Sequence, residues 1–137
     1  MKILIIDDSI DYCVALHDLI KREFEFRTDE LVIEKSYDGT TGIKKFKEME
    51  PDITFVDLCF EPVQATLQGY DICKALKKED SSRIVVLLTG YNKTFPDVKK
   101  ILSENLVYTH LPKSPNTKNI KNLIDKLMQQ RYAGAVA

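Results

Sequence analysis

The chain has 137 residues, of which 44% are hydrophobic and 30% are charged, with 20 basic and 21 acidic side chains. This length suits a single folded domain, and the Gly and Pro counts of 5 each exclude a collagen-like or low-complexity chain. The net charge of −1 excludes a general electrostatic attraction to nucleic acid or to an anionic membrane. Because no apolar run approaches the roughly 20 residues that cross a bilayer and no basic-then-apolar leader opens the chain, we expect a soluble cytoplasmic protein without membrane insertion or direct nucleic-acid binding.

The cysteine pattern favours a reducing compartment. The three cysteines are odd in number and form no CxxC pair, which argues against a disulfide framework and against a zinc site. We expect free and largely buried thiols at Cys13, Cys59 and Cys73.

Strand and helix patterns alternate along the chain. Short apolar runs rich in β-branched residues predict strands at 2–6, 31–35, 52–56, 83–88 and 106–111. Apolar residues at helical spacing predict helices at 10–24, about 40–49, 70–78, 96–103 and 116–131. Since right-handed crossovers carry each helix over the sheet, this alternation predicts an α/β fold, a doubly wound five-stranded parallel sheet of the flavodoxin-like (βα)5 type. We expect one domain over residues 1–131 and a short C-terminal tail over 132–137.

Chemically active side chains follow the predicted strands. Asp7 and Asp8 end the first strand, Asp57 ends the third, Thr89 ends the fourth, and Lys113 follows the fifth. Ligands of open parallel sheets bind beyond the carboxyl ends of the strands. We therefore expect three carboxylates, a hydroxyl and an ammonium to converge at one edge of the sheet.

The expected charges of this edge call for a metal ion. Three carboxylates within a few ångströms repel one another, and a divalent cation together with the Lys113 ammonium would balance them. Oxygen ligands favour Mg²⁺, with Mn²⁺ as the alternative. A metal ion beside an ammonium and a hydroxyl suits phosphoryl-group chemistry, in which Asp57 is the natural nucleophile.

Four segments carry a resemblance that spans essentially the whole chain: KILIIDD at the start, DITFVDL around Asp57, VVLLTG around Thr89, and HLPKSP around Lys113. In this set and order, the chain resembles the receiver domain of two-component response regulators. The resemblance implies that Asp57 accepts a phosphoryl group from a histidine kinase or a histidine phosphotransfer protein. It also implies limited self-catalysed phosphorylation and dephosphorylation, and no activity as a turnover enzyme.

The same resemblance implies roles for the other residues at this edge. Asp7 and Asp8 would hold Mg²⁺ together with Asp57, and the main-chain carbonyl of Cys59 would be a further ligand. Thr89 would hydrogen-bond the phosphoryl oxygens, Lys113 would pair with them, and the small Gly90 would leave the approach open. The output would be a change in the surface formed by the fourth helix, the fifth strand and the last helix, which binds a downstream partner and is also a candidate homodimer contact.

Residues of the predicted switch leave alternatives open. Thr89 is one switch residue of the family, and the switch aromatic lies three residues before the lysine, where this chain has His110. Tyr108, two residues earlier, is a substitute because the period of a strand places both on one face. We favour the reading in which His110 is a partly solvated strand residue.

The sequence departs from the family pattern in two places. The loop from Asp57 to Gly69, DLCFEPVQATLQG, is longer than usual, and we favour an ordinary surface loop over a role in partner choice or access. After Lys113 the chain has Ser114 and then Pro115, where the family usually has a proline joined by a cis peptide. A cis bond before Ser114 would cost about 2.5–4 kcal/mol, so either the fold supports this strain or the loop takes another path.

Four other functions fit the same predicted fold. A phosphatase of the haloacid dehalogenase type would need a second aspartate where this chain has Cys59, and an FMN-binding flavodoxin would need a hydroxyl- and glycine-rich loop in place of Asp7 and Asp8. A phosphorylation-independent pseudo-receiver and the receiver portion of a longer regulator or hybrid kinase stay open.

Overall fold

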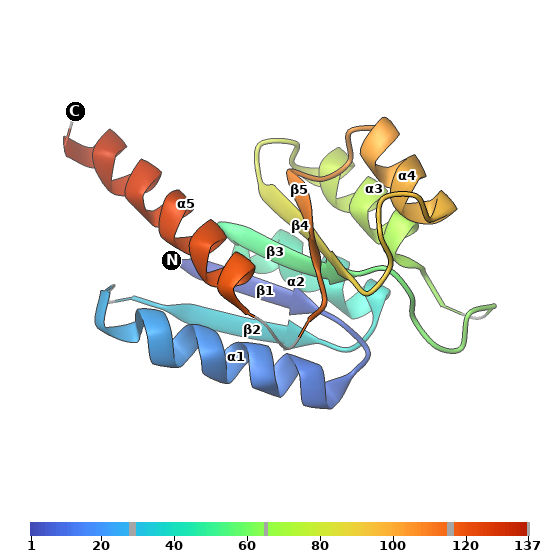
Figure 1. Cartoon of the computed structure of the whole chain (residues 1–137), viewed down its shortest axis with the longest axis horizontal. Helices are drawn as coiled ribbons and strands as arrows, with labels where there is room; N and C mark the ends of the chain where they lie inside the picture. Colours follow the sequence, from blue (N-terminus) through green and yellow to red (C-terminus); the bar gives the residue numbers. More distant parts are fainter. Residues whose placement is uncertain (28–29, 65, 115–116, 137) are drawn as a thin grey trace.

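The computed structural model describes residues 1–27, 30–64, 66–114 and 117–136, with side chains as far as residue 130. One parallel sheet contains the five strands in the order β2-β1-β3-β4-β5. The strands are β1 (Lys2–Ile6), β2 (Val32–Ser36), β3 (Ile53–Asp57), β4 (Ile84–Thr89) and β5 (Thr109–Pro112). The order reverses at β1, which confirms the predicted doubly wound, flavodoxin-like sheet (Figure 1).

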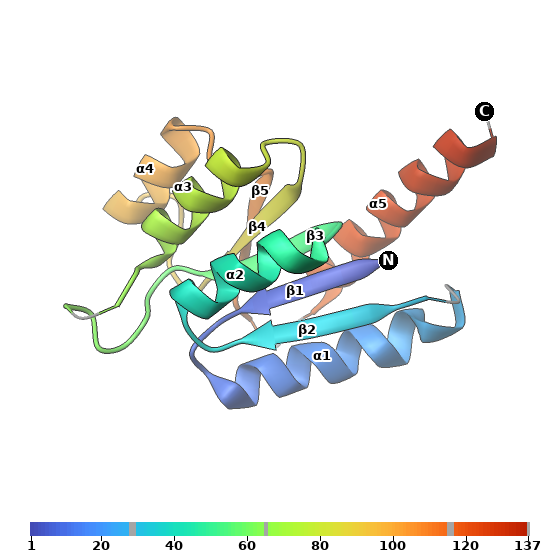
Figure 2. The same cartoon turned by 180° about the vertical axis from the view of Figure 1, so that it is seen from behind.

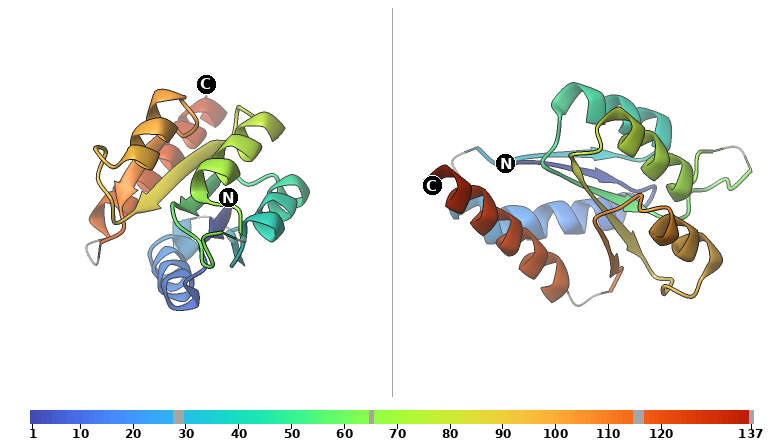
Figure 3. Two further views of the ribbon diagram at one scale, coloured as in Figure 1. Left: turned by 90° about the vertical axis from the view of Figure 1, so that its right-hand side faces the viewer. Right: turned by 90° about the horizontal axis from the view of Figure 1, so that it is seen from above.

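Helices cover both faces of the sheet. The structure has α1 (Ile10–Phe24), a short 3₁₀ helix η1 (Glu25–Arg27), α2 (Gly39–Met49), α3 (Gly69–Glu79), α4 (Pro96–Ser103) and α5 (Lys118–Val136). Helices α1 and α5 lie on one face, and α2 and α3 lie on the other (Figure 3). Seen from behind, α2 lies across β1 (Figure 2).

The central strands are buried because each supplies side chains to a core on either face. In β1, Ile3 and Ile5 pack with residues of α1 and α5, whereas Leu4 and Ile6 pack with residues of α2 and α3. All four side chains are at most 1% exposed. A strand that is buried on both faces needs a continuous apolar run, which is why the KILII pattern predicts it correctly.

The fifth strand differs from its predicted bounds. We predicted it over 106–111, but β5 begins at Thr109, and its pairing with β4 starts there. Leu106 and Val107 instead pack their side chains into the clusters beneath α3 and α4. The segment that was predicted as one strand therefore serves two different structural purposes.

The last helix also extends further than its pattern predicts. We expected it over 116–131 with a tail after it, but the backbone of α5 continues as a helix to Val136. Alanine is the strongest helix former, and no proline intervenes after the last apolar turn. Among the described helices, none is both long and apolar enough to span a membrane.

Candidate functional site

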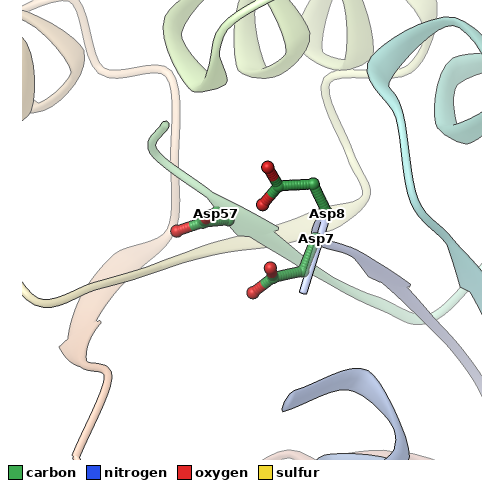
Figure 4. Close-up of side chains that lie close together, drawn as sticks. All are labelled: Asp7, Asp8 and Asp57. Carbon is green, nitrogen blue, oxygen red and sulfur yellow. The ribbon is translucent and has the colours of Figure 1, made fainter. Parts of the chain in front are cut away.

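Three carboxylates meet at the carboxyl ends of the two adjacent central strands. Asp57 is the last residue of β3, and Asp7 and Asp8 follow β1 directly. One oxygen of each carboxylate lies within 4.8 Å of the others (Figure 4). Asp7 is 2% exposed, and the other two are half-buried. The pairing of β1 with β3 therefore brings together the carboxylates that the strand ends predict.

Main-chain amides hold two of these carboxylates locally. The Ser9 N–H donates to Asp7 Oδ1 at 2.9 Å, and the Leu58 N–H donates to Asp57 Oδ1 at 2.9 Å. Each amide is only one or two residues further along the chain. The turns after β1 and β3 thus orient the carboxylates that follow from those strands.

The third carboxylate depends on a distant segment. The Glu61 N–H, in the loop between β3 and α3, donates to Asp8 Oδ2 at 2.9 Å across a separation of 53 residues. The loop therefore contacts the site directly through its main chain.

Lys113 provides a positive charge at the same edge. Its Nζ lies 2.6 Å from Asp7 Oδ2 and 3.7 Å from Asp57 Oδ1. The same ammonium lies over the ring of Tyr12, 4.3 Å from its centroid, which is within cation–π range. The predicted lysine thus pairs mainly with Asp7, and it leaves Asp57 only partly compensated.

The electrostatics of Asp57 follow from this arrangement. Burial and, to a smaller extent, the negative charge of Asp7 raise the pKa of Asp57 from 3.8 to about 6, against the opposing effects of Lys113 and the Leu58 amide. Asp57 is therefore a partly desolvated carboxyl in a site that also carries the negative charges of Asp7 and Asp8. Such a site favours the binding of a cation.

Thr89 joins the fourth and fifth strands at the site. It is 2% exposed, its Oγ1 accepts a hydrogen bond from the Tyr91 N–H at 3.1 Å, and its carbonyl accepts one from the Lys113 N–H at 2.9 Å. A Cβ added at Gly90 would meet no atom within 4 Å. The space next to this glycine is therefore open.

Cys59 lies two residues after Asp57 and is half-buried. Burial and the negative charge of Asp57 raise the pKa of its thiol, which keeps it protonated. Cys13 and Cys73 are free and buried, as predicted, and Cys59 is also free.

The two candidate switch residues differ in exposure and in their position relative to β5. Tyr108 is 49% exposed and precedes β5, while His110 lies within β5, half-buried and paired with Leu87. The Tyr108 N–H donates to the Val85 carbonyl of β4 at 2.8 Å, although β5 itself begins only at Thr109. The half-buried position of His110 agrees with a partly solvated strand residue.

The segment after Lys113 follows another path and avoids the strained cis peptide before Ser114. Within the described parts of the chain, the only cis peptide precedes Pro62, so the bond between Lys113 and Ser114 is trans. Pro115 lies outside the described residues.

The sequence reasoning did not identify Tyr12 or the Glu61 amide. Tyr12 could have been found, since α1 begins at the same sheet edge and its first turn must lie beside the carboxylates. The amide carries no side-chain signal, and only the folded loop shows where it points.

The comparisons with known proteins agree with this geometry. The family model of the response regulator receiver domain matches residues 3–125. No curated protein matches the chain. The fold is similar to the N-terminal domain of an uncharacterized protein from Wolinella succinogenes, with 20% identity, a TM-score of 0.78 and 98% of both chains covered.

Two further solved structures share the fold. The receiver domain of a DNA-binding response regulator from Colwellia psychrerythraea 34H has 23% identity and a TM-score of 0.77, over 94% of this chain and 98% of that one. The response regulator TrrA from Thermotoga maritima, solved in complex with Mg²⁺-BeF, has 22% identity and a TM-score of 0.66, over 92% of this chain and 97% of that one. With a family model that spans most of its length and a sheet edge that carries the family's acidic cluster and lysine, the chain belongs to the response regulator receiver domains of two-component systems.

Proposed function

We propose that this receiver domain accepts a phosphoryl group on Asp57 from a histidine kinase or a histidine phosphotransfer protein. The observation that supports this most directly is the half-buried Asp57, which lies between two further carboxylates and the Lys113 ammonium at one edge of the sheet. Because Asp57 Oδ1 accepts the Leu58 amide, its Oδ2 is the oxygen that can attack phosphorus. The new O–P bond forms as the P–N bond of the phosphohistidine donor breaks, and the bond electrons leave on the imidazole.

Mg²⁺ is the cation that fits the donor set, with Mn²⁺ as a substitute. The carboxylates of Asp7, Asp8 and Asp57 offer oxygen ligands of the kind that hard divalent ions prefer, and the Cys59 carbonyl would add another. The negative charges of Asp7 and Asp8, which add to the effect of burial in raising the pKa of Asp57, support this assignment. When bound, the ion neutralises charge on the transferring oxygens.

Lys113 and Thr89 would stabilise the phosphorylated state. Lys113 Nζ is already 3.7 Å from Asp57 Oδ1, so it can move from Asp7 to a phosphoryl oxygen without rearrangement of the main chain. Thr89 Oγ1, which accepts the Tyr91 amide, can donate its proton to a phosphoryl oxygen. The domain forms and loses its own acyl phosphate in this account, and it is not a turnover enzyme.

The signalling surface would be the one formed by α4, β5 and α5, and we place the protein in the cytoplasm with its kinase. Tyr91 stacks on Phe95 with ring centroids 4.1 Å apart, and Tyr91 and Tyr108 are each 49% exposed next to α4 and β5. Exposed aromatic side chains are enriched at protein interfaces. A downstream protein or a second copy of the chain is the expected partner, and neither membrane insertion nor direct nucleic-acid binding is needed.

The test is intact mass after incubation with acetyl phosphate, with and without Mg²⁺. The wild type should gain a single phosphoryl adduct that depends on Mg²⁺, and Asp57→Asn should gain none. The control is Asp18→Asn, which makes the same change at an exposed position of α1 and should be phosphorylated normally. A folded protein that binds Mg²⁺ but gains no adduct would instead be a phosphorylation-independent pseudo-receiver.

A further inference from the structure

In the loop between β3 and α3, residues 58–68, the peptide group that joins Phe60 to Glu61 is hydrogen-bonded through both its carbonyl and its N–H. The Phe60 carbonyl accepts a hydrogen bond from Gln68 Nε2 at 2.9 Å. The amide of the same peptide, the Glu61 N–H, donates to Asp8 Oδ2 at 2.9 Å. Because a peptide group is planar and rigid, fixing the carbonyl end also fixes the direction of the N–H.

Gln68 contacts Phe60 on both sides. Its Oε1 accepts the Phe60 N–H at 2.9 Å, while its Nε2 donates to the Phe60 carbonyl and, at 3.2 Å, to the Val63 carbonyl. This pair of hydrogen bonds defines the rotation of the main chain at Phe60. The Phe60 ring, 1% exposed, is packed in the core beneath α2 and α3, which prevents the loop from moving as a whole.

Asp8 is the carboxylate that depends on this arrangement. The amides that hold Asp7 and Asp57 come from the next one or two residues, so the local turns supply them. The amide that holds Asp8 comes from 53 residues away and reaches the site only if the loop is correctly oriented. This hydrogen bond to Oδ2 fixes the orientation of the Asp8 carboxylate relative to the site.

We propose that Gln68 is a positioning residue for the metal site, which acts through the Phe60–Glu61 peptide on Asp8. The inference rests on the proposed Mg²⁺ site and assigns a function to the long loop of this chain. Gln68 touches neither the ion nor the phosphoryl group. Its effect is to orient a ligand carboxylate before the ion arrives, and loss of a partner that orients a metal ligand typically weakens binding by about 10- to 100-fold.

The test is the Mg²⁺ dissociation constant of the full chain, stripped of metal with EDTA and measured by isothermal titration calorimetry. Gln68→Ala removes all of the contacts, and Gln68→Glu keeps the size of the side chain but replaces the donor to the Phe60 carbonyl with an oxygen. Both variants should weaken Mg²⁺ binding by about tenfold. Gln64→Ala, the same change at an exposed position of the same loop, should leave the dissociation constant within twofold of wild type.

Glu61→Ala separates the main chain from the side chain of that residue. It keeps the N–H that contacts Asp8, so it should weaken Mg²⁺ binding less than Gln68→Glu does. A greater loss in Glu61→Ala would overturn the proposal, because the carboxylate and not the amide would then carry the effect.

A purely structural role for Gln68 would give a different result. The thermal midpoint in EDTA would fall in the Gln68 variants, while their Mg²⁺ dissociation constants would stay within twofold of wild type, and this would overturn the proposal. Failure of the proposed phosphoacceptor function is recognisable separately, since a wild type that binds Mg²⁺ and gains no phosphoryl adduct still gives the dissociation constants that decide the role of Gln68.

Discussion

Gly69 is the position at which a single methyl group should most disturb the strand that ends at Asp57. A Cβ built there would lie 2.5 Å from the Asp57 carbonyl oxygen and 2.7 Å from both Cα and O of Leu58. All three atoms belong to the main chain, so no side-chain rotation relieves the overlap, and the start of α3 must move away by about 1 Å to reach ordinary contact.

The cost of Gly69→Ala can be worked from these contacts. Overpacking against a rigid neighbour costs about 1–3 kcal/mol, and weakening of the 2.8 Å hydrogen bond from the Gly69 N–H to the Leu58 carbonyl adds about 1 kcal/mol. The higher helix propensity of alanine returns at most about 1 kcal/mol. With the full gain in helix propensity counted, we expect a loss of about 1–3 kcal/mol in the free energy of unfolding.

Equilibrium urea denaturation of metal-free protein measures this loss. Gly90→Ala is the matched control, since its added Cβ meets no atom within 4 Å, and it should change the free energy of unfolding by less than about 0.5 kcal/mol. Equal stability of the two variants would refute the reasoning, because it would mean that the backbone beside Asp57 yields to a methyl group without cost.

Three further predictions concern charge, burial and the lysine. The pKa of Asp57 is raised to about 6, so the stability contributed by its neutral form is present below pH 3.8 and is lost as the pH rises through 6. Asp57→Asn should therefore stabilise the metal-free protein by about 1–2 kcal/mol at pH 7.5 and should have no effect near pH 4. Thermal unfolding in the presence of EDTA measures both values. The Thr54 hydroxyl is fully buried and has no hydrogen-bond partner among the described residues. Thr54→Val should therefore raise the free energy of unfolding in urea by about 1 kcal/mol. A decrease would contradict the view that this hydroxyl is buried without a partner. The Tyr12 ring faces the Lys113 ammonium, so Tyr12→Leu should slow phosphorylation by acetyl phosphate about three- to tenfold. Tyr12→Phe, which keeps the ring, should react at the wild-type rate. An equal effect of both variants would implicate the hydroxyl instead.

The fold and much of the site were predictable because both depend on strong local patterns. A continuous apolar run such as Ile3–Ile6 has few alternatives to a buried strand, and parallel topology then requires Asp7, Asp8 and Asp57 to meet at one edge. Lys113 also lies at this edge, as the position after the fifth strand predicted.

The start of the fifth strand was predicted wrongly because apolar residues can either form a strand or pack beneath a helix. Leu106 and Val107 are as apolar as a strand requires, but they fill the space beneath α3 and α4, so β5 begins later. The link between Gln68 and Asp8 could not be predicted, since it passes through a main-chain peptide and no periodicity reports the direction of a single amide.

The order of the strands attaches the carboxylates and the lysine of the site to strands that differ in pairing and burial. The carboxylates follow β1 and β3, which are paired on both sides and buried, whereas Lys113 follows β5, a four-residue strand at the edge of the sheet. Local opening costs least where few buried contacts protect the backbone. We therefore expect amide-hydrogen exchange to be faster through β5 than through β1 and β3, so that a molecule opened at β5 keeps its negative cluster intact while its lysine is displaced.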